Sequence, residues 1–278
     1  MKKINRRSFL AAAGLTAAAL ALTACGGSAS STASSTASSA ASSEAASTSA
    51  AAELTTVEAG KLTMATNAAF PPYEMTTDAG EFEGIDIDTA KAIAEKLGLE
   101  LQIDDMDFDA ALLSVQQGKA DIVMAGVTVT DERKAVMDFS DSYATGIQSI
   151  IVPEGSDITS PDDLAGKKIG TQRGTTGYIY CSDDFGDDAV VAYDDGLTAV
   201  QALNNGQVDA VVIDNAPAKE FVAANPGLVI LDTSYAAEDY AIGLAKGSAL
   251  EDAVNAALEE LKADGTLQSI VDKYITAE

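Results

Sequence analysis

The chain has 278 residues, of which 43 are acidic and 17 are basic, giving a formal net charge of -26, and it contains no histidine. So acidic a protein is a poor partner for nucleic acid or anionic lipid, because both carry negative charge. The lack of histidine excludes a Ser-His-Asp triad, a Cys-His dyad and a His-based zinc site.

Residues 1–24 are typical of an export signal. Basic residues, among them Arg6-Arg7, precede an apolar stretch from Phe9 to Leu22 that is too short to span a membrane. The arginine pair also resembles a twin-arginine signal. The segment Leu22-Thr23-Ala24-Cys25-Gly26 resembles a lipobox, in which Cys25 is lipidated and becomes the first mature residue. An ordinary cleavage site is the alternative. With Cys25 lipidated, Cys181 has no partner, and we expect no disulfide.

Residues 25–59 predict a flexible tether. Between Gly26 and Ala52 the sequence consists almost entirely of Ser, Ala and Thr, with a single charge at Glu44. Such a composition cannot bury a core. About 220 residues remain for the folded part, enough for two modest lobes.

The first expected strand, Lys61 to Thr66, leads into a proline-containing loop. This loop runs from Asn67 to Glu74, and its two consecutive prolines hold it extended and stiff. Phe70 and Tyr73 would then be aromatic side chains on a rigid rim. The alternative is that both rings only pack the loop.

A helix is expected to begin within Glu83-Gly84-Ile85-Asp86-Ile87-Asp88 and to end at Gly98. We interpret its aspartates as helix-start residues rather than as a site. A strand from Leu99 to Asp104 and a helix from Ala110 to Gln117 follow.

The spacing of Asp105, Asp107 and Asp109 is similar to the start of a calcium loop. Such a loop needs glycine at its sixth position and glutamate at its twelfth. This sequence has Ala110 and Gln116 there, so we expect no calcium site. The sequence indicates no other metal and no cofactor.

The stretch from Gly126 to Arg133 is the strongest candidate for a binding site. It follows an apolar strand, Asp121 to Ala125, and combines a glycine that allows close backbone approach, the hydroxyl of Thr128 and an arginine. Thr130 is a good N-cap for a short helix that contains the arginine. Because arginine can hold a carboxylate through two parallel hydrogen bonds, the arrangement is suited to a small zwitterion. A solvated surface arginine is the alternative.

This stretch carries a family resemblance. Gly126-Val127-Thr128-Val129-Thr130-Asp131-Glu132-Arg133, followed by Asp138-Phe139-Ser140, resembles the signature of the polar amino acid-binding proteins of ABC importers, solute-binding protein family 3. Gly84-Ile85-Asp86-Ile87-Asp88 resembles the family's second signature, and Gly265-Thr266-Leu267 resembles its usual C-terminal sequence. The resemblance extends from about Gly60 to the C-terminus.

The second half of the chain contains two further candidate segments. A strand from Lys167 to Thr171 precedes Gln172-Arg173-Gly174-Thr175-Thr176-Gly177, which leads into a helix. A glycine-flanked helix N-terminus presents unpaired backbone N–H groups that can bind a carboxylate. Another strand, Val208 to Ile213, is followed by Asp214, which should stand at the mouth of the sheet. Its alternative role is to cap the next helix.

Alternating strands and helices predict mostly parallel sheets with helices on both faces. The resemblance implies a two-lobe α/β fold of the type II periplasmic-binding-protein kind, with two hinge crossings. We place the crossings at Tyr143 to Gly146 and at Ala237 to Ala241. The first lobe would comprise residues 60–143 and 241–278, and the second residues 144–240.

The resemblance also implies a ligand held between the lobes. Positions matching Asn67 and Phe70 line the family's pocket, and the ring matching Phe108 lies opposite that of Phe70, so that the two enclose the ligand. Gln172 matches a position that contacts the ligand side chain. The full set of expected ligand-binding residues is Asn67, Phe70, Tyr73, Phe108, Gly126, Thr128, Arg133, Gln172, Thr175, Thr176 and Asp214.

The charged ends of the ligand would be divided between the lobes. Arg133 from the first lobe would bind the α-carboxylate. Thr175 and Thr176 match the segment with which the family closes over that same group. Asp214 from the second lobe matches the aspartate that binds the α-ammonium.

The implied function is that of an extracytoplasmic, monomeric substrate-binding lipoprotein. It would capture a polar L-amino acid by hinge closure and deliver it to a permease with its ATPase, while anchored to the outer face of the plasma membrane or lying in a periplasm. We expect no catalysis. The alternatives are a prephenate dehydratase-like enzyme, with Glu74 or Asp107 as general acid, and an amino acid sensor module. A neutral Asn67 opposite Gln172 favours glutamine or cystine, while Glu74 and Asp107 leave a basic amino acid open.

Overall fold

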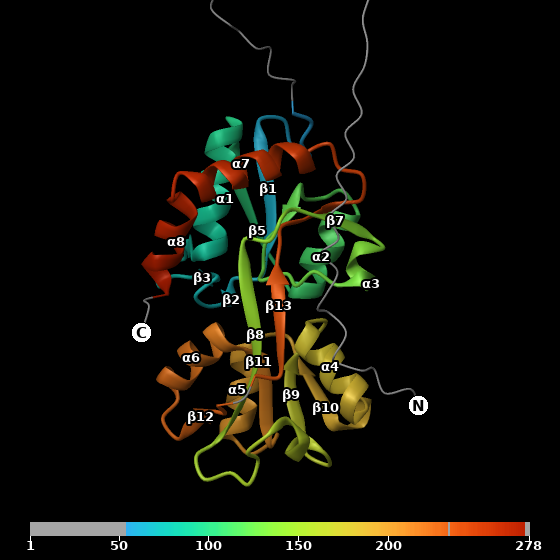
Figure 1. Ribbon diagram of the computed structural model, residues 1–278, viewed down its shortest axis with the longest axis vertical. Helices are drawn as coiled ribbons and strands as arrows, with labels where there is room; N and C mark the ends of the chain where they lie inside the picture. Colours follow the sequence, from blue (N-terminus) through green and yellow to red (C-terminus); the bar gives the residue numbers. More distant parts are fainter. Residues whose placement is uncertain (1–53, 233, 276–278) are drawn as a thin grey trace, which may run out of the picture. The chain divides into compact units, whose positions relative to one another are not determined.

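The computed structural model describes residues 54–232 and 234–275. The predicted export signal, the lipidation site Cys25 and nearly all of the predicted tether lie outside the described residues. Within them, no helix combines the length and the apolar character that a membrane span requires. The described chain forms two lobes, each built on its own sheet (Figure 1).

The first lobe contains a five-stranded sheet in the order β5-β1-β6-β14-β7. Strand β1 runs parallel to β5 and β6, whereas β14 runs antiparallel to β6 and β7. The strands are β1 (Lys61–Thr66), β5 (Glu100–Asp105), β6 (Ile122–Val123), β7 (Met137–Phe139) and β14 (Gly243–Ala245). The helices are α1 (Ile85–Leu97), α2 (Phe108–Gln116), α3 (Asp131–Lys134), α7 (Glu251–Ala263) and α8 (Thr266–Tyr274). A small sheet joins β2 (Ala69–Phe70), β3 (Glu74–Thr76) and β4 (Phe82–Glu83).

The second lobe contains a six-stranded sheet in the order β10-β9-β11-β8-β12, with β13 also paired to β8. Strands β9, β10 and β11 are parallel, but β8 is antiparallel to its three partners. The strands are β8 (Ala144–Pro153), β9 (Ile169–Gln172), β10 (Val190–Tyr193), β11 (Ala210–Asp214), β12 (Leu228–Ile230) and β13 (Ala236–Tyr240). The helices are α4 (Thr176–Phe185), α5 (Gly196–Asn204) and α6 (Asn215–Ala224), with short 3-10 turns at Pro161–Leu164 and Asp187–Ala189. Both sheets are therefore mixed rather than mostly parallel.

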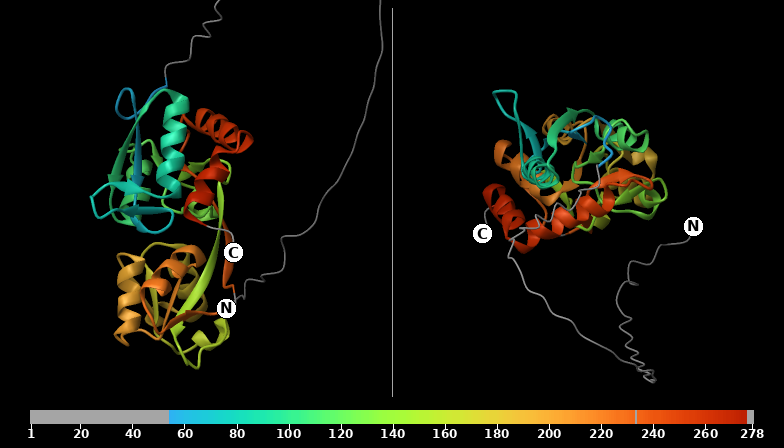
Figure 2. Two further views of the ribbon diagram at one scale, coloured as in Figure 1. Left: turned by 90° about the vertical axis from the view of Figure 1, so that its left-hand side faces the viewer. Right: turned by 90° about the horizontal axis from the view of Figure 1, so that it is seen from above.

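Strands β8 and β13 form the connection between the lobes. They pair antiparallel from Ala144 opposite Tyr240 to Gln148 opposite Ala236. The chain enters the second sheet along β8 and returns along β13, as Figures 1 and 2 show. The first lobe therefore contains both ends of the folded chain, because α7 and α8 follow the return strand.

Local sequence accounts for where two of the helices end or begin. Helix α1 ends at Gly98, whose left-handed φ of 69° suits glycine and lets its N–H reach the carbonyl of Glu95. The predicted N-cap Thr130 is confirmed, since its Oγ1 accepts the backbone N–H of Arg133 at 3.2 Å. This cap fixes the backbone from which the arginine side chain extends.

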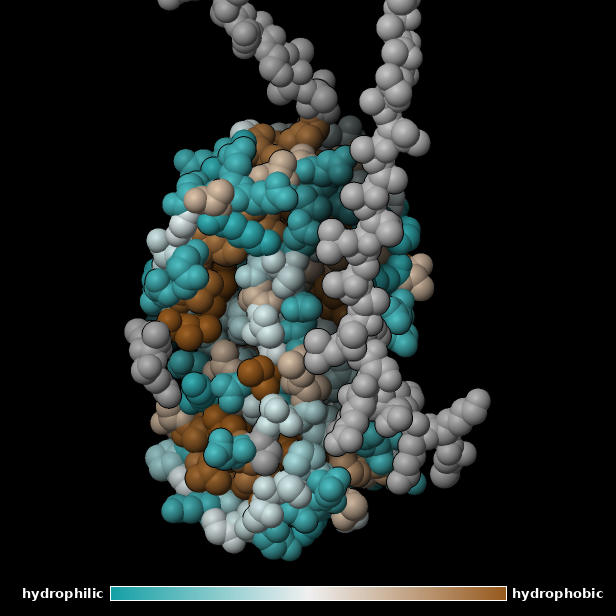
Figure 3. All heavy atoms as spheres, viewed as in Figure 1, coloured by the Kyte–Doolittle hydropathy of each residue, from teal (hydrophilic) through white to brown (hydrophobic). Residues whose placement is uncertain are grey.

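Apolar side chains fill the interior of each lobe. In the first lobe Leu62, Met64 and Ile122 are fully buried, and in the second Ile150 and Ile169 are fully buried. Each such side chain contributes about 1.5–3 kcal/mol by leaving water. On the face shown in Figure 3, hydrophobic residues form separate patches among hydrophilic ones. Among the described residues, five acidic side chains are buried: Glu74, Asp86, Asp121, Asp214 and Glu238.

Candidate functional site

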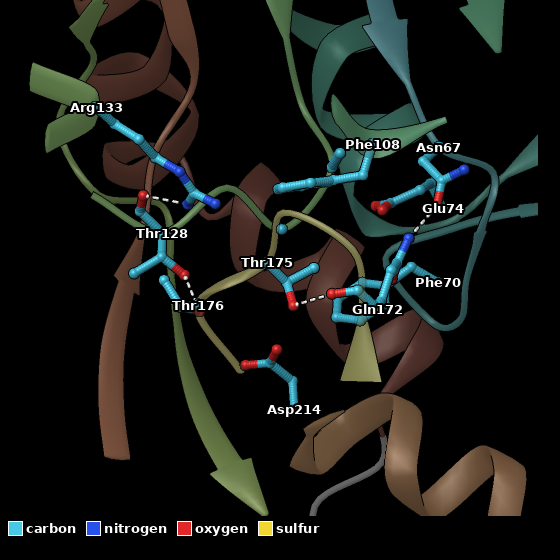
Figure 4. Close-up of a pocket in the computed structure, with 12 residues that line it drawn as sticks. Asn67, Phe70, Glu74, Phe108, Thr128, Arg133, Gln172, Thr175, Thr176 and Asp214 are labelled. Carbon is cyan, nitrogen blue, oxygen red and sulfur yellow. Dashed lines mark hydrogen bonds between the residues drawn. The ribbon is translucent and has the colours of Figure 1, made fainter. Parts of the chain in front are cut away.

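A pocket lies between the lobes at the carboxyl ends of the central strands. The lobes lie close together here, and the cavity between them has a volume of only about 10 Å³. It is lined by Asn67, Phe70, Glu74, Phe108, Ala125, Gly126, Thr128, Arg133, Gln172, Thr175, Thr176 and Asp214 (Figure 4). Every residue predicted for the site except Tyr73 is in this lining, while Glu74 and Ala125 were not in the predicted set. The roles of the predicted residues in ligand binding stay predictions.

Fold topology explains why residues so far apart in sequence converge here. Asn67 follows β1, Phe108 begins α2 after β5, and Gly126 follows β6. On the other lobe, Gln172 ends β9 and Asp214 ends β11. In α/β sheets, ligands bind beyond the carboxyl ends of the strands, and here the two such edges face one another.

The guanidinium of Arg133 is buried and held by neutral groups. Its Nη1 donates to the carbonyl of Thr128 at 2.7 Å, and its Nη2 donates across the cleft to the carbonyl of Gly174 at 3.2 Å. The ring of Phe108 lies 5.3 Å from its Cζ, within the range of a cation–π contact. The predicted surface alternative is wrong, because only 8% of the residue is exposed.

Arg133 is also a cation without a nearby carboxylate. Among the described residues it makes no ion pair within 4.0 Å, and burial lowers its pKa against the opposing influence of Glu238 and Asp214. A buried guanidinium whose direct partners are carbonyls lacks a negative charge that compensates its own. The arrangement can accept an anion such as a ligand carboxylate.

Asp214 supplies a negative charge from the opposite lobe. It occupies the N-cap position of α6 but makes no side-chain capping bond. Its Oδ2 instead accepts from Nε2 of Gln148 at 2.8 Å, and its Oδ1 has no donor among the described residues. Burial, and then the charge of Glu238, raise the pKa of Asp214 to about 7. An ammonium group placed beside it would restore its charged form.

Glu238 and Gln148 do not line the pocket but hydrogen-bond to the lining residues Thr128 and Asp214, and the sequence analysis missed both. Oε2 of Glu238 accepts from Nε2 of Gln148 and from Oγ1 of Thr128, both at 3.0 Å. The second of these bonds joins β13 to the loop after β6. The signal in the sequence was a polar residue within each crossing strand, and the structure buries both, with Gln148 1% exposed and Glu238 6% exposed.

Two further contacts cross the cleft. Nε2 of Gln172 donates to Oδ1 of Asn67 at 2.8 Å, and Oγ1 of Thr128 lies 3.4 Å from Oγ1 of Thr176. The hydroxyl of Thr175 is engaged within its own lobe, donating to the carbonyl of Gln172 at 2.8 Å. The lobes are thus in direct polar contact around the pocket.

Two of the aromatic residues line the pocket, and a third supports one of them from behind. Phe70 and Phe108 line the pocket from the first lobe. Tyr73 does not line it, because its ring stacks behind Phe70 with centroids 5.9 Å apart and meets Tyr240 edge-on at 5.2 Å. The prediction that both loop aromatics form a rim is therefore wrong for Tyr73, which packs the loop against the core.

Two buried carboxyls lie on the first-lobe side of the pocket. Glu74 lines it, and Asp86 lies behind, with both residues fully buried. Asp86 is in the first turn of α1, as predicted, but its Oδ2 also accepts the N–H of Gly126 at 3.0 Å and the hydroxyl of Tyr143 at 2.8 Å. It therefore supports the pocket wall as well as starting a helix. Asp107 lines a separate hollow at the rim, near Arg173.

The described residues contain no grouping of three or more Cys, Asp or Glu side chains placed to hold a metal ion. The polar groups that converge on the pocket instead divide by charge. A cation from the first lobe faces anions from both lobes, which is complementary to a small molecule carrying a carboxylate and at least one ammonium or similar group.

Comparison with known proteins agrees with this geometry. Residues 62–277 match the family model described as bacterial extracellular solute-binding proteins, family 3. The chain is 32% identical to a probable histidine-binding protein of Neisseria gonorrhoeae over 99% of this chain and 98% of the relative. It is 33% identical to the L-cystine-binding protein TcyJ of Escherichia coli K12, over 80% of this chain and 85% of the relative.

Solved structures show the same relationship. An ancestral arginine-binding protein bound to arginine is 43% identical to this chain, with a TM-score of 0.74 over 78% of this chain and 98% of the other. These relatives bind solutes and are not enzymes, which removes the dehydratase alternative. The chain belongs to family 3 of the bacterial extracellular solute-binding proteins, in which it serves as the substrate-binding protein of an amino acid ABC transporter.

Proposed function

We propose that the bound substrate is a basic L-amino acid, with arginine as the leading candidate. The observation that carries this proposal is Glu74, a fully buried carboxyl that lines the pocket and receives no hydrogen bond from the described residues. Figure 4 shows its carboxyl in the region between Asn67 and Phe108. A cationic side chain lying between the rings of Phe70 and Phe108 would reach it.

The charge balance of the cleft supports a cation. Among the described residues, four buried carboxyls lie in or behind the pocket, those of Glu74, Asp86, Asp214 and Glu238, and Arg133 is the one buried cation. An amino acid with a neutral side chain brings one positive and one negative group and leaves the excess of carboxyls over cations unchanged. A basic amino acid brings one further positive charge, and a pair of unit charges 4 Å apart near a protein surface attract by about 4 kcal/mol. This reasoning reverses the preference for glutamine or cystine that a neutral Asn67 suggested.

We further propose that capture proceeds by hinge closure at the β8–β13 ribbon. The moving bodies would be residues 60–143 with 241–278 and residues 144–240. The α-carboxylate would bind Arg133 with Thr175 and Thr176, and the α-ammonium would bind Asp214. Since each lobe supplies part of the charge complement, a ligand with both groups stabilises the closed form more than a ligand with one of them.

Delivery and location complete the proposal. The lipobox-like segment supports lipidation at Cys25, and residues 26–52 would let the folded part reach a permease from the outer face of the membrane. A Cys25→Ala variant should then be released from membranes into the soluble fraction. Retention of that variant on membranes would contradict lipid anchoring.

The test of the substrate class is a thermal-shift screen followed by titration calorimetry with arginine, lysine, ornithine, glutamine and cystine. A ligand at a hundredfold excess over its Kd should stabilise the folded protein by about 2.7 kcal/mol. We expect arginine to raise Tm most. Tighter binding of glutamine or cystine would refute the basic preference, and no binding of any amino acid would refute the proposed function.

A further inference from the structure

The carboxyl of Asp214 is held from outside the pocket by residues of the two crossing strands. Nε2 of Gln148, on β8, donates to Oδ2 of Asp214 at 2.8 Å and to Oε2 of Glu238, on β13, at 3.0 Å. Of these three residues only Asp214 lines the pocket. All three are buried. Two acidic side chains thus share a single side-chain amide in a place from which water is largely excluded.

The chemistry of the amide fixes its orientation. The nitrogen of a side-chain amide carries two hydrogens, and ionised carboxylates only accept. With Nε2 toward Asp214 and Glu238, each carboxyl can take one hydrogen, whereas a reversed amide would turn its oxygen toward two acceptors. A longer approach of 3.5 Å to the hydroxyl of Thr176 competes only weakly. Gln148 consequently sets the direction of the Asp214 carboxyl.

Glu238 is itself anchored to the first lobe. Its Oε2 accepts from Oγ1 of Thr128 at 3.0 Å. The backbone of Thr128 also forms an antiparallel bridge with Tyr240, two residues after Glu238 on the same strand. Thr128 is therefore held beside β13, and through Glu238 it fixes the other end of the Gln148 amide.

Asp214 depends on this support because it has no other hydrogen bond of its own. Its Oδ1 accepts nothing from the side chains and backbone of the described residues, and its side chain makes no bond to α6. Figure 4 shows its carboxyl directed toward the other labelled residues of the pocket. Without the Gln148 amide, both oxygens would be unpaired before a ligand arrives, and the carboxyl could turn about its side-chain bonds.

We propose that Gln148 and Glu238 are positioning residues of the site that binds the α-ammonium of the ligand. Gln148 holds the Asp214 carboxyl in the direction that meets the ammonium, and Glu238 holds Gln148. Neither residue lines the pocket. The inference rests on the α-ammonium site of the proposed function. It adds that two residues of the strands joining the lobes determine how strongly that ammonium is bound.

Titration calorimetry with two ligands tests the role of Gln148. The ligands are L-arginine and 5-guanidinopentanoate, which keeps the carboxylate and the guanidinium but has hydrogen in place of the α-ammonium. Gln148→Leu should lower the affinity for L-arginine by about tenfold or more, as expected when a hydrogen bond to a charged group is lost, and that for the analogue by less than about twofold. Equal losses for the two ligands, or unchanged arginine binding, would overturn the inference.

A pair of variants tests the role of Glu238 with L-arginine alone. Glu238→Gln keeps an oxygen that can accept from Gln148 and Thr128, whereas Glu238→Ala removes it. The glutamine variant should bind arginine nearly as the wild-type protein does, and the alanine variant should lose affinity as Gln148→Leu does. Equal affinities of the two variants would contradict the positioning role. This pair also decides the matter if Gln148→Leu does not fold, or if the analogue binds too weakly for calorimetry.

Ser149→Ala is the matched control. Ser149 follows Gln148 on β8 and is 2% exposed, and its hydroxyl accepts from Nδ2 of Asn215 at 3.1 Å. Because successive side chains of a strand point to opposite faces, this hydroxyl lies away from the Gln148 amide. We expect wild-type affinity for arginine. A loss as large as that of Gln148→Leu would count against the inference, since any change in β8 would then weaken binding.

The outcomes separate this inference from the proposed function. If the wild-type protein binds arginine and the variants of Gln148 and Glu238 bind it equally well, only the positioning role fails. If the wild-type protein binds glutamine instead, L-glutamine and glutaramate replace the two ligands, because the α-ammonium is common to all amino acids. If it binds no amino acid, the proposed function itself fails.

Discussion

Replacing Arg133 by alanine should abolish capture of amino acids while the protein stays folded. The guanidinium is buried, is held by two carbonyls and a phenylalanine ring, and has no carboxylate of the protein as a direct partner. Removing it leaves the bound carboxylate of the ligand buried without its cation. Breaking a buried charge pair in this way costs about 3–5 kcal/mol, which corresponds to roughly two to nearly four orders of magnitude in Kd.

Titration calorimetry with arginine measures this loss, and circular dichroism checks the fold. Arg173→Ala is the matched control, because Arg173 also lies beside the cleft but its side chain is 55% exposed and pairs only loosely with Asp194 at 3.4 Å. An exposed pair of this kind contributes about 1 kcal/mol or less. We expect the control to bind almost normally. Normal arginine binding by Arg133→Ala would refute the proposed role of the guanidinium.

Three further predictions concern the residues around this charge pair. Because the pKa of Asp214 is raised to about 7, the ligand-free protein should lose up to about 4 kcal/mol of stability as the pH rises from about 4 to 7. In thermal melts, Asp214→Asn should lose less stability over this pH range. An unchanged dependence of Tm on pH would contradict the raised pKa of Asp214. Gly146→Ala should weaken binding and destabilise the protein by about 1–3 kcal/mol, because the added Cβ would clash with Tyr240 and lie 2.6 Å from Oδ1 of Asp214. Urea unfolding measures the loss, and an unchanged midpoint would contradict this reasoning. Thr130→Ala removes the cap of α3 and should cost about 1 kcal/mol of stability and weaken arginine binding, whereas Thr130→Ser should restore both.

The sequence allowed the two-lobe α/β fold and the strand-end position of the pocket to be predicted. Apolar strands such as Asp121 to Ala125 and clear helix stops such as Gly98 define the elements, and the family motif orders them. The sheets could not be predicted to be mixed, because antiparallel pairing of β8 and β14 depends on where the chain returns rather than on local periodicity.

Residues that act through partners distant in sequence were harder to identify. Arg133 and Asp214 follow strands and carry charge, so their positions were visible in the pattern. Gln148 and Glu238 lie within crossing strands, and only the pairing of β8 with β13 shows that they meet. Asp86 fits a helix start so well that its second contact, with Gly126, left no separate trace in the sequence. Tyr73 shows the converse, since the same proline-stiffened loop turns one aromatic toward the cleft and the other into the core.

The hydrogen bond from Arg133 to Gly174 has a kinetic consequence. The guanidinium of Arg133 would bind the substrate and also hold the opposite lobe through its hydrogen bond to Gly174. A bound molecule could then leave only after this hydrogen bond has broken. Its residence time would therefore be set by the rate at which the lobes open. Substrates that bind both lobes more strongly would slow this opening and would therefore stay bound longer.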